Sequence, residues 1–303
     1  MKLGLWFTAR FGRGVTFEEH FGHMREQVRL ARDGGFAMIA GGQHYLGPRL
    51  QTLPLLARLA EDAGEMEMAT AVVLLPLQNP IDLAEQAATM NAMLGGGFIL
   101  GVGLGHQADE REAFGISRES VVPRFEEALQ VMDRVWDGDG QPFHGQYYHL
   151  PALDLAWPIP YIRPRIWIGG SSDKGFQRAR TNNLPWFPSD FDLEALAQRY
   201  DAHPPAPGSQ PLDRPVGVWV HIADSDEQAR ADATRLGHLD AAGRPTAAAI
   251  IGSPETVLKR MAAYRRRIGV THLLARVQLP GMGQPESTRR IELLAERVIP
   301  RLG

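Results

Sequence analysis

Cysteine is absent from this 303-residue chain, and its absence removes several kinds of chemistry at once. Without cysteine there is no disulfide, no thiolate nucleophile, no iron–sulfur ligation and no cysteine-bound zinc. An excess of basic charge is also lacking, because 32 lysines and arginines stand against 35 acidic residues and the formal net charge is −3. Nucleic acid is therefore not the expected partner.

Long apolar runs are missing too, since no stretch approaches the roughly 20 residues that a membrane-spanning helix needs. We therefore expect no membrane partner. The first residues, MKLGLWFTAR, hold a single lysine and reach polar residues too soon for a signal peptide, so a cytoplasmic location is the default expectation. Hydrophobic residues make up 44% of the chain and charged residues 22%, as in ordinary soluble globular proteins.

Clusters of metal ligands are scarce as well. His20 and His23 share a helical pattern, and His144 and His149 flank an expected hairpin, but neither pair comes with carboxylates at ligand spacing. There is no His-Glu-x-x-His motif. The sequence therefore predicts no metal site.

Eight short apolar runs are present instead, separated by amphipathic stretches. They are near-continuous rather than alternating, which is typical of strands buried on both faces of a parallel sheet. The predicted strands are 3–7, 36–40, 66–75, 98–104, 165–169, 184–187, 216–222 and 271–277. Strands that alternate with helices in this number favour a (β/α)8 barrel, here a single domain over 1–303, and an open doubly wound sheet is the alternative.

The stretches between the strands show helical periodicity. Apolar residues from Phe21 to Ala31 fall on one helical face, and a second face runs from Phe125 to Trp136 until Asp137-Gly138 ends it. Ser253 and the proline after it predict another helix start.

Two regions exceed a minimal barrel. Residues 138–164 are rich in aromatics and proline, and residues 237–252 precede an extra helix between the last two predicted strands. Insertions after barrel strands usually lie at the C-terminal face, where active sites form. We therefore expect both regions to be lids that contact substrate.

The stretch RPRIWIGGSSDKGFQRAR places Gly169, Gly170, Ser171 and Ser172 between a predicted strand and a helix. The amide groups of a helix start attract anions, and glycines let the backbone come close, so this junction suits a phosphate. The alternative is that Ser172 or Asp173 only caps the helix.

Other side chains also stand at predicted strand ends. His44, in AGGQHYLG, is placed for acid–base work or for a loop hydrogen bond, and Arg276, in LLARVQLPGM, for binding an anion or for a salt bridge. Phe7 is a core residue or the wall for a flat ligand. Gly103, in GVGLGHQAD, predicts either a tight turn at the end of the strand or a small-residue floor under such a ligand. A dinucleotide-binding fingerprint is not expected here, because no acidic residue follows at the end of a second strand.

Taken together, these segments resemble the bacterial luciferase-like flavin-dependent oxidoreductases. The resemblance covers nearly the whole chain and rests on residues 77–105, 124–150, 163–180, 251–264 and 269–302. It implies a (β/α)8 barrel that binds reduced FMN, or in one branch of the family a deazaflavin coenzyme, at the C-terminal face. The flavin phosphate would lie on Gly169, Gly170, Ser171 and Ser172. The ring system would lie near Ala71, Val72 and Val73, where the family often has a non-prolyl cis peptide.

The resemblance also matches His44 to a catalytic histidine in a Glu-His-His-type motif, but Gln43 replaces the acid here and Tyr45 the second histidine. We expect a monooxygenase that uses reduced FMN and dioxygen on a small organic substrate, with Phe7 and Arg276 as substrate contacts. A separate NAD(P)H:flavin reductase would supply the reduced flavin, and the family resemblance allows a homodimer. Two alternatives stay open, namely deazaflavin-dependent hydride transfer and flavin binding without turnover.

Overall fold

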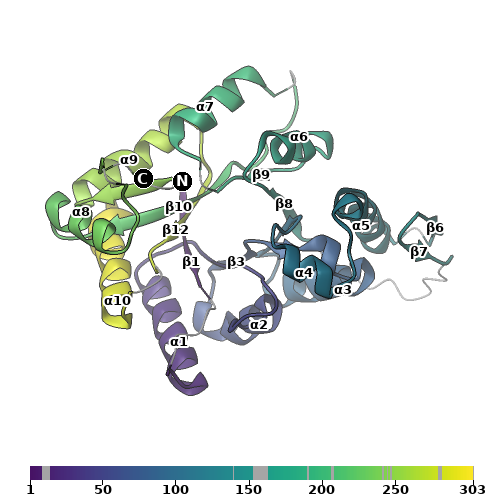
Figure 1. Cartoon of the computed structure of the whole chain (residues 1–303), viewed down its shortest axis with the longest axis horizontal. Helices are drawn as coiled ribbons and strands as arrows, with labels where there is room; N and C mark the ends of the chain where they lie inside the picture. Colours follow the sequence, from purple (N-terminus) through teal and green to yellow (C-terminus); the bar gives the residue numbers. More distant parts are fainter. Residues whose placement is uncertain are drawn as a thin grey trace.

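The computed structural model describes residues 1–8, 14–138, 140–152, 163–189, 191–205, 208–240, 242, 243, 245, 248–278 and 282–302. Within them the main sheet is parallel and curled, and runs in the order β11-β10-β12-β1-β2-β3-β5-β8-β9, with β4 added beside β5 (Figure 1). Its strands are β1 (Lys2–Phe7), β2 (Met38–Gly41), β3 (Glu67–Thr70), β4 (Val73–Leu74), β5 (Phe98–Gly103), β8 (Arg165–Gly169), β9 (Trp186–Phe187), β10 (Pro215–Ile222), β11 (Ala249–Gly252) and β12 (His272–Arg276).

All eight predicted apolar runs carry a strand of this sheet. Their side chains are buried on both faces, as the continuous apolar pattern predicts. The run 66–75 is interrupted, because residues 71 and 72 leave the sheet between β3 and β4. Strand β11 was not predicted.

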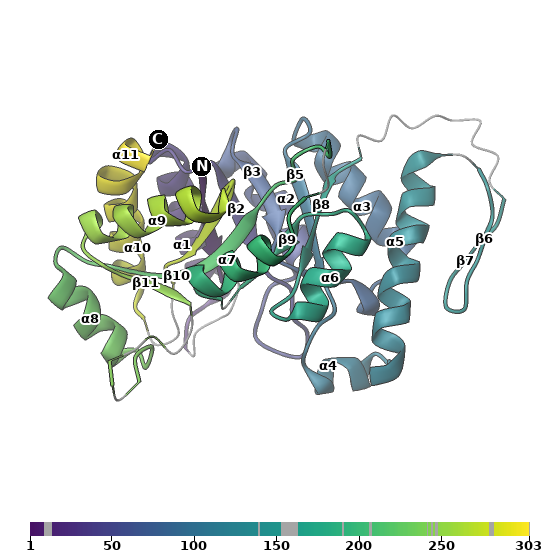
Figure 2. The same ribbon diagram turned by 90° about the horizontal axis from the view of Figure 1, so that it is seen from above.

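Helices cover the outside of the sheet (Figures 1 and 2). They are α1 (Phe17–Asp33), α2 (Thr52–Ala63), α3 (Pro80–Met93), α4 (Ala108–Ala113), α5 (Val121–Asp137), α6 (Asp173–Thr181), α7 (Leu193–Ala202), α8 (Asp226–Arg235), α9 (Pro254–Ile268), α10 (Gln284–Leu293) and α11 (Ile299–Leu302). None of the helices in the described parts of the chain has both the length and the apolar composition for crossing a bilayer.

The predicted helix ends are confirmed by their caps. Helix α5 stops at Gly138, which is left-handed with φ of 62°, and α9 begins after Ser253, whose side chain accepts the Thr256 amide hydrogen. Helix α1 starts with a capping box between Thr16 and Glu19.

Strand β10 is shared between neighbours. Its first half, Pro215 to Trp219, pairs with β12, and its second half, Trp219 to Ile222, pairs with β11. On the remaining side the Gly217 amide donates to the Pro188 carbonyl at 3.0 Å, within an isolated parallel bridge between Ser189 and Gly217. In the described residues the β9 end of the sheet therefore meets β10 through one bridge and not through a ladder.

The predicted insertion at 138–164 forms a hairpin of β6 (Phe143–His144) and β7 (His149–Leu150), and residues 153–162 lie outside the described residues. The Glu127 carboxylate on α5 ties it down by accepting amide hydrogens from Gln146, Tyr147 and Tyr148 at 2.9, 2.8 and 3.3 Å. Figure 2 shows the hairpin alongside α5, on the side turned away from the main sheet. The segment follows a helix and not a strand, so it starts at the amino ends of the strands. The prediction of a lid falls partly on residues 153–162, which lie outside the described residues, and stays a prediction.

Candidate active site

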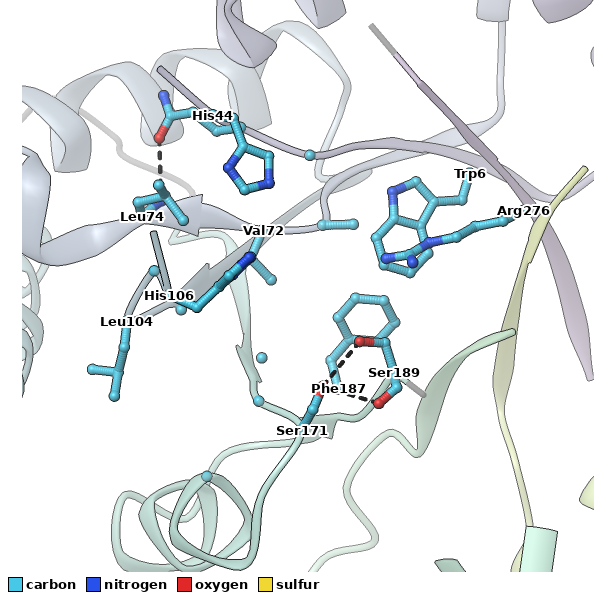
Figure 3. A pocket seen from close by; sticks show the side chains of 18 of the residues that line it. Trp6, His44, Val72, Leu74, Leu104, His106, Ser171, Phe187, Ser189 and Arg276 are labelled. Atoms are coloured by element: carbon cyan, nitrogen blue, oxygen red, sulfur yellow. Dashed lines mark hydrogen bonds between the residues drawn. The ribbon is translucent and has the colours of Figure 1, made fainter. Parts of the chain in front are cut away.

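A cavity of about 720 Å³ opens where the parallel strands end (Figure 3). Its walls come from residues at or just beyond the carboxyl ends of most strands of the main sheet, together with Trp219 from within β10. All the site residues predicted from the sequence line this one cavity: Phe7, His44, Ala71, Val72, Gly103, Gly169, Gly170, Ser171, Ser172 and Arg276. Their shared location follows from the parallel sheet, and their individual roles stay predictions.

One part of the cavity wall is built around Val72. The Ala71–Val72 peptide is cis, as the family resemblance implied for this segment. A Cβ added at Gly103 would lie 2.7 Å from Val72 Cγ2, and one added at Gly169 would lie 2.6 Å from Val72 Cγ1. The two glycines therefore make the space that the valine occupies, and the surface left beside it is free of bulky side chains.

Gln43 supports the same wall. It is buried, its backbone N–H donates to the Val72 carbonyl at 3.1 Å, and its side-chain oxygen accepts the Leu74 amide hydrogen at 3.1 Å (Figure 3). The residue that replaces the expected acid thus has a structural role, and its Nε2 also donates to Gln51 Oε1 at 3.2 Å, a bond that an ionised carboxylate could not donate.

The glycine–serine turn forms the opposite end of the cavity. The Ser172 hydroxyl accepts the Gly175 amide hydrogen at 3.2 Å and so caps α6, as the alternative interpretation expected. The Ser171 hydroxyl donates to the Ser189 carbonyl at 3.0 Å. Gly170 is packed so closely that a Cβ there would lie 3.2 Å from Gly175 Cα. Capping does not exclude an anion, since amides of the first helical turn remain directed toward the cavity end of the helix.

Arg178 adds a fixed positive charge at this end, and the sequence reasoning missed it. Its guanidinium lines the cavity, is only 10% exposed, and donates from Nε to Glu126 at 3.0 Å. The available signal was helical spacing, because Gly175 and Arg178 are three residues apart on α6 and therefore share a face with the start of the helix.

His44 is held from behind by Glu110, which the sequence reasoning also missed. Glu110 is 1% exposed, and its Oε1 lies 3.1 Å from His44 Nδ1 and accepts the Tyr45 amide hydrogen at 2.6 Å. Burial lowers the pKa of His44, and the nearby Glu110 carboxylate opposes that shift without cancelling it. Gln107 Nε2 lies 3.1 Å from the same Nδ1, so Nδ1 is occupied by protein partners and Nε2 is the nitrogen left to accept or return a proton.

Aromatic side chains and Arg276 close the remaining side (Figure 3). The Arg276 guanidinium carbon lies 3.3 Å from the centre of the Trp6 ring and 4.9 Å from the centre of the Trp219 ring. The Phe187 ring packs against Trp6 with a centroid distance of 5.3 Å. Phe7, in the next position after Trp6, also lines the cavity.

The described parts of the two predicted lids do not line the cavity. None of the described residues of 138–164 or of 237–252 lines it. In the second segment the Ala248 carbonyl accepts the Trp219 amide hydrogen at 3.2 Å, and the His238 ring lies edge-on to the Trp219 ring at 5.2 Å, so described residues of this segment contact a residue of the cavity wall. Among the described residues no three histidine or acidic side chains are grouped to hold a metal.

Comparison with known sequences decides the family. Residues 1–245 match the model for luciferase-like monooxygenases. This chain belongs to the luciferase-like monooxygenase family. Its membership supports an oxidoreductase with a flavin-type cofactor, as the sequence resemblance predicted.

Individual relatives are distant. The oxygenase component of the flavin-dependent trigonelline monooxygenase of Acinetobacter baylyi is 24% identical over 235 residues, which are 73% of this chain and 64% of that protein. A phthiodiolone/phenolphthiodiolone dimycocerosates ketoreductase of a Mycobacterium species is 30% identical over 46% of this chain and 38% of its own length. The chain thus spans less than two thirds of these curated relatives.

Solved structures agree in fold over the whole chain. The oxygenating constituent of 3,6-diketocamphane monooxygenase from Pseudomonas putida, solved with FMN, has a TM-score of 0.83 at 19% identity and covers 100% of this chain and 99% of its own. An F420-dependent secondary alcohol dehydrogenase, solved with an F420–acetone adduct, has a TM-score of 0.78 at 16% identity with the same coverage. At such identities the likeness shows the fold alone.

The residues of the cavity fit a flavin. Val72, Gly103 and Gly169 line the cavity together with apolar residues such as Phe187 and Leu104, which is the kind of wall that a ring system packs against. The α6 start, the Ser171 region and Arg178 supply donors and positive charge for a phosphate at one end. His44, in contact with Glu110, lines the same cavity.

Proposed function

We propose that this chain is the oxygenase of a two-component flavin-dependent monooxygenase. Reduced FMN, dioxygen and a small organic substrate would give oxidised FMN, the substrate with one added oxygen atom, and water. A separate NAD(P)H:flavin reductase would supply the reduced FMN. One observation carries the proposal: a single cavity holds an anion-binding helix start at one end and a glycine-lined flat wall with a histidine at the other. The name of the Acinetobacter relative, an oxygenase component, supports the division of labour.

The phosphate would be held by the amides that begin α6 and by Arg178, and the ring system would lie along Val72 between Gly103 and Gly169. Bound reduced FMN supplies the electrons that activate dioxygen. Glu110 positions His44 so that its Nε2 can hand over or accept a proton at the reacting centre.

Apolar walls would exclude water from the reaction. Phe7, Leu74 and Phe187 are buried and face the cavity, and Leu104 lines it beside them. Charged intermediates are protected in such a dry site because competing proton transfer to solvent is suppressed.

We further propose that the sheet closes as a (β/α)8 barrel within one domain over 1–303. The hydrogen bond from Gly217 to Pro188, at 3.0 Å, supports closure between β9 and β10, and the TM-scores above 0.7 over the full chain support the single domain.

Anaerobic titration of the purified chain tests the cofactor directly. We expect reduced FMN to bind more tightly than the deazaflavin coenzyme F420. When the FMN complex is mixed with air-saturated buffer, the flavin absorbance between about 370 and 450 nm should show slow reoxidation in two phases. The F420-dependent dehydrogenase among the similar folds favours the alternative of hydride transfer without oxygen. Tighter binding of reduced F420, with no oxygen reactivity, would establish that alternative.

The His44→Ala variant separates catalysis from simple flavin storage. If His44 moves a proton, the variant should bind reduced FMN normally and lose about 100-fold or more in substrate oxygenation rate. A chain that only stores flavin would show no oxygenation in either form, and the substitution would change nothing beyond the affinity for FMN.

A further inference from the structure

Two histidine rings lie close together in the wall of the cavity, and the proposed function uses one of them. His44 comes from the segment after β2 and His106 from the segment after β5, and both line the cavity. Their ring centroids are 5.7 Å apart, and the rings meet edge-on at 86°. Figure 3 shows the two rings beside Val72. At this spacing one bridging water can connect a nitrogen of one ring to a nitrogen of the other.

The side of His44 that faces away from the cavity offers no path for protons. Its Nδ1 lies 3.1 Å from Glu110 Oε1 and 3.1 Å from Gln107 Nε2. Glu110 is 1% exposed, and its Oε2 is buried without a hydrogen-bond partner among the described residues. No chain of hydrogen bonds between described residues therefore leads from Oε2 to the surface. His44 exchanges protons through Nε2, which is reached from the cavity.

His106 faces both the cavity and the solvent. It lines the cavity and is exposed, and its ring nitrogens form no hydrogen bond with any residue in the described parts of the chain. An imidazole with both nitrogens available can take up a proton from water on one nitrogen and release a proton from the other.

The neighbours of His106 in sequence fix its place beside His44. Gly105 has a φ of 74°, in the left-handed region that glycine adopts without strain, and this lets the chain turn after β5. Gln107 contacts His44 Nδ1 with its side chain, and its carbonyl accepts a hydrogen bond from Arg111 at 3.0 Å. The segment that contacts His44 thus also carries His106, so the spacing of the two rings is set locally.

The proposed reaction consumes one proton in the cavity at each turnover. Anionic reduced FMN, dioxygen, substrate and one proton give oxidised FMN, the oxygenated substrate and water. Without substrate the products are oxidised FMN and hydrogen peroxide, and one proton is again consumed. The buried apolar wall residues Leu74 and Phe187 cannot carry a proton, so the proton has to enter along polar side chains.

We propose that His106 is a proton shuttle between solvent and His44. Protonated His106 gives its proton through one water to His44 Nε2 and takes up another from solvent, and His44 Nε2 passes the proton to the reacting centre. The inference rests on the proposed function, because it describes the path of the proton that this reaction consumes.

The charges around the pair favour release of the proton by His44. Burial lowers the pKa of His44 most, the Glu110 carboxylate raises it, and Arg49 and protonated His106 lower it further. Arg49 lines the same cavity. A ring that holds its proton weakly passes it on readily, as a donor at the reacting centre must.

Rescue by a small buffer tests the shuttle. The reduced FMN complex is mixed with oxygenated solution at low buffer concentration in a stopped-flow instrument. His106→Gln should slow the appearance of oxidised flavin about tenfold or more, and added imidazole should restore the rate in proportion to its concentration, because a diffusing acid replaces the missing ring. A variant as fast as the unchanged protein, or a slow variant that imidazole does not restore, would overturn the inference.

His144→Gln is the matched control. His144 is exposed, does not line the cavity, and has its ring centroid 5.9 Å from that of His149. The variant therefore removes one member of a histidine pair of similar spacing elsewhere on the surface. Its flavin reoxidation should match that of the unchanged protein with and without imidazole. Equal slowing and equal rescue in both variants would show an unspecific effect and sink the proposal.

A measurement on the flavin-free protein distinguishes the shuttle from a merely structural role. The Cε1–H resonance of His44, followed by NMR across pH, gives the pKa of this ring. His106→Gln should raise that pKa because a neighbouring positive charge is removed, and His144→Gln should leave it unchanged. If the pKa of His44 is the same with and without His106, the two rings do not interact and the inference is wrong.

The outcomes also separate this inference from the proposed function. If reduced FMN binds and reacts with oxygen, but neither the rate nor the imidazole response depends on His106, the inference alone fails. If the unchanged protein binds no reduced FMN, the proposed function itself fails, and the inference falls with it.

Discussion

Arg178 offers a direct test of where the flavin phosphate lies. The Arg178→Gln substitution removes the fixed cation beside the start of α6 and keeps a polar side chain of similar reach. Its structural cost should be small, because the partner Glu126 is 35% exposed and still accepts a hydrogen bond from Asn182 at 3.1 Å. Losing a partly exposed ion pair of this kind costs less than about 1 kcal/mol.

The expected effect on binding is larger and depends on the ligand. A hydrogen bond to a charged group contributes about 1.5–3 kcal/mol, so FMN should bind Arg178→Gln about 10- to 150-fold more weakly. Riboflavin has the same ring system without the phosphate, and its dissociation constant should change by less than about twofold. Both constants can be measured by anaerobic titration of the reduced flavins, at one ionic strength since salt screens this contact.

Arg180→Gln is the control for this pair of ligands. Arg180 is exposed on the same helix and does not line the cavity, so the variant carries the same change in charge without the contact. The reasoning would be refuted if FMN and riboflavin weakened by the same factor in Arg178→Gln, or if Arg180→Gln weakened FMN as much.

Two further predictions concern buried titratable groups. Glu110→Gln should leave the affinity for FMN unchanged and slow substrate oxygenation about tenfold or more, because His44 loses the carboxylate that orients it. In stopped-flow kinetics, the variant that carries both Glu110→Gln and His44→Ala should be no slower than His44→Ala alone. Burial, together with Arg290 and His238, holds the pKa of His221 at about 3, below its usual 6.5, so the unfolded chain takes up this proton first. The free energy of unfolding should therefore fall by up to about 1.4 kcal/mol per pH unit below 6.5. Urea titrations at several pH values should show that the unfolding free energy of His221→Gln depends less steeply on pH than that of the unchanged protein.

The strands and the edge at which they end were predictable, because a strand that is buried on both faces is a short continuous run of apolar residues. Each apolar run marked a strand, and parallel strands bring their carboxyl ends to one edge, so His44, Gly169 and Arg276 were expected together without knowledge of any contact. The glycines at 103 and 169 were recognisable as small, although only the structure shows that Val72 requires them.

The partners of the predicted residues were not predictable in the same way. Glu110 contacts His44 across 66 positions of sequence, and no local pattern links a helical acid to a distant strand end. Trp219 looked like one more core residue of a strand, yet it contacts Arg276. Such pairs depend on the exact curl of the sheet, which periodicity does not encode.

The place where the 138–164 segment begins has a topological cause. Residues 138–164 were judged by composition, whereas their location depends on what precedes them, and a segment after α5 starts at the amino ends of the strands. The Glu127 carboxylate, which collects three amide hydrogens of the hairpin, gave no signal in the sequence because a single glutamate on an amphipathic helix is ordinary.

The single bridge beside β10 links hydrogen exchange of one backbone amide to the binding of ligand in the cavity. The Gly217 amide depends on one acceptor, the Pro188 carbonyl, and its residue packs directly against Trp6. Transient opening of this seam would expose the amide to solvent exchange and would displace the indole that contacts Arg276. Deuterium uptake at the Gly217 amide should therefore slow when a ligand fills the cavity, so that the exchange rate of this one hydrogen measures ligand binding.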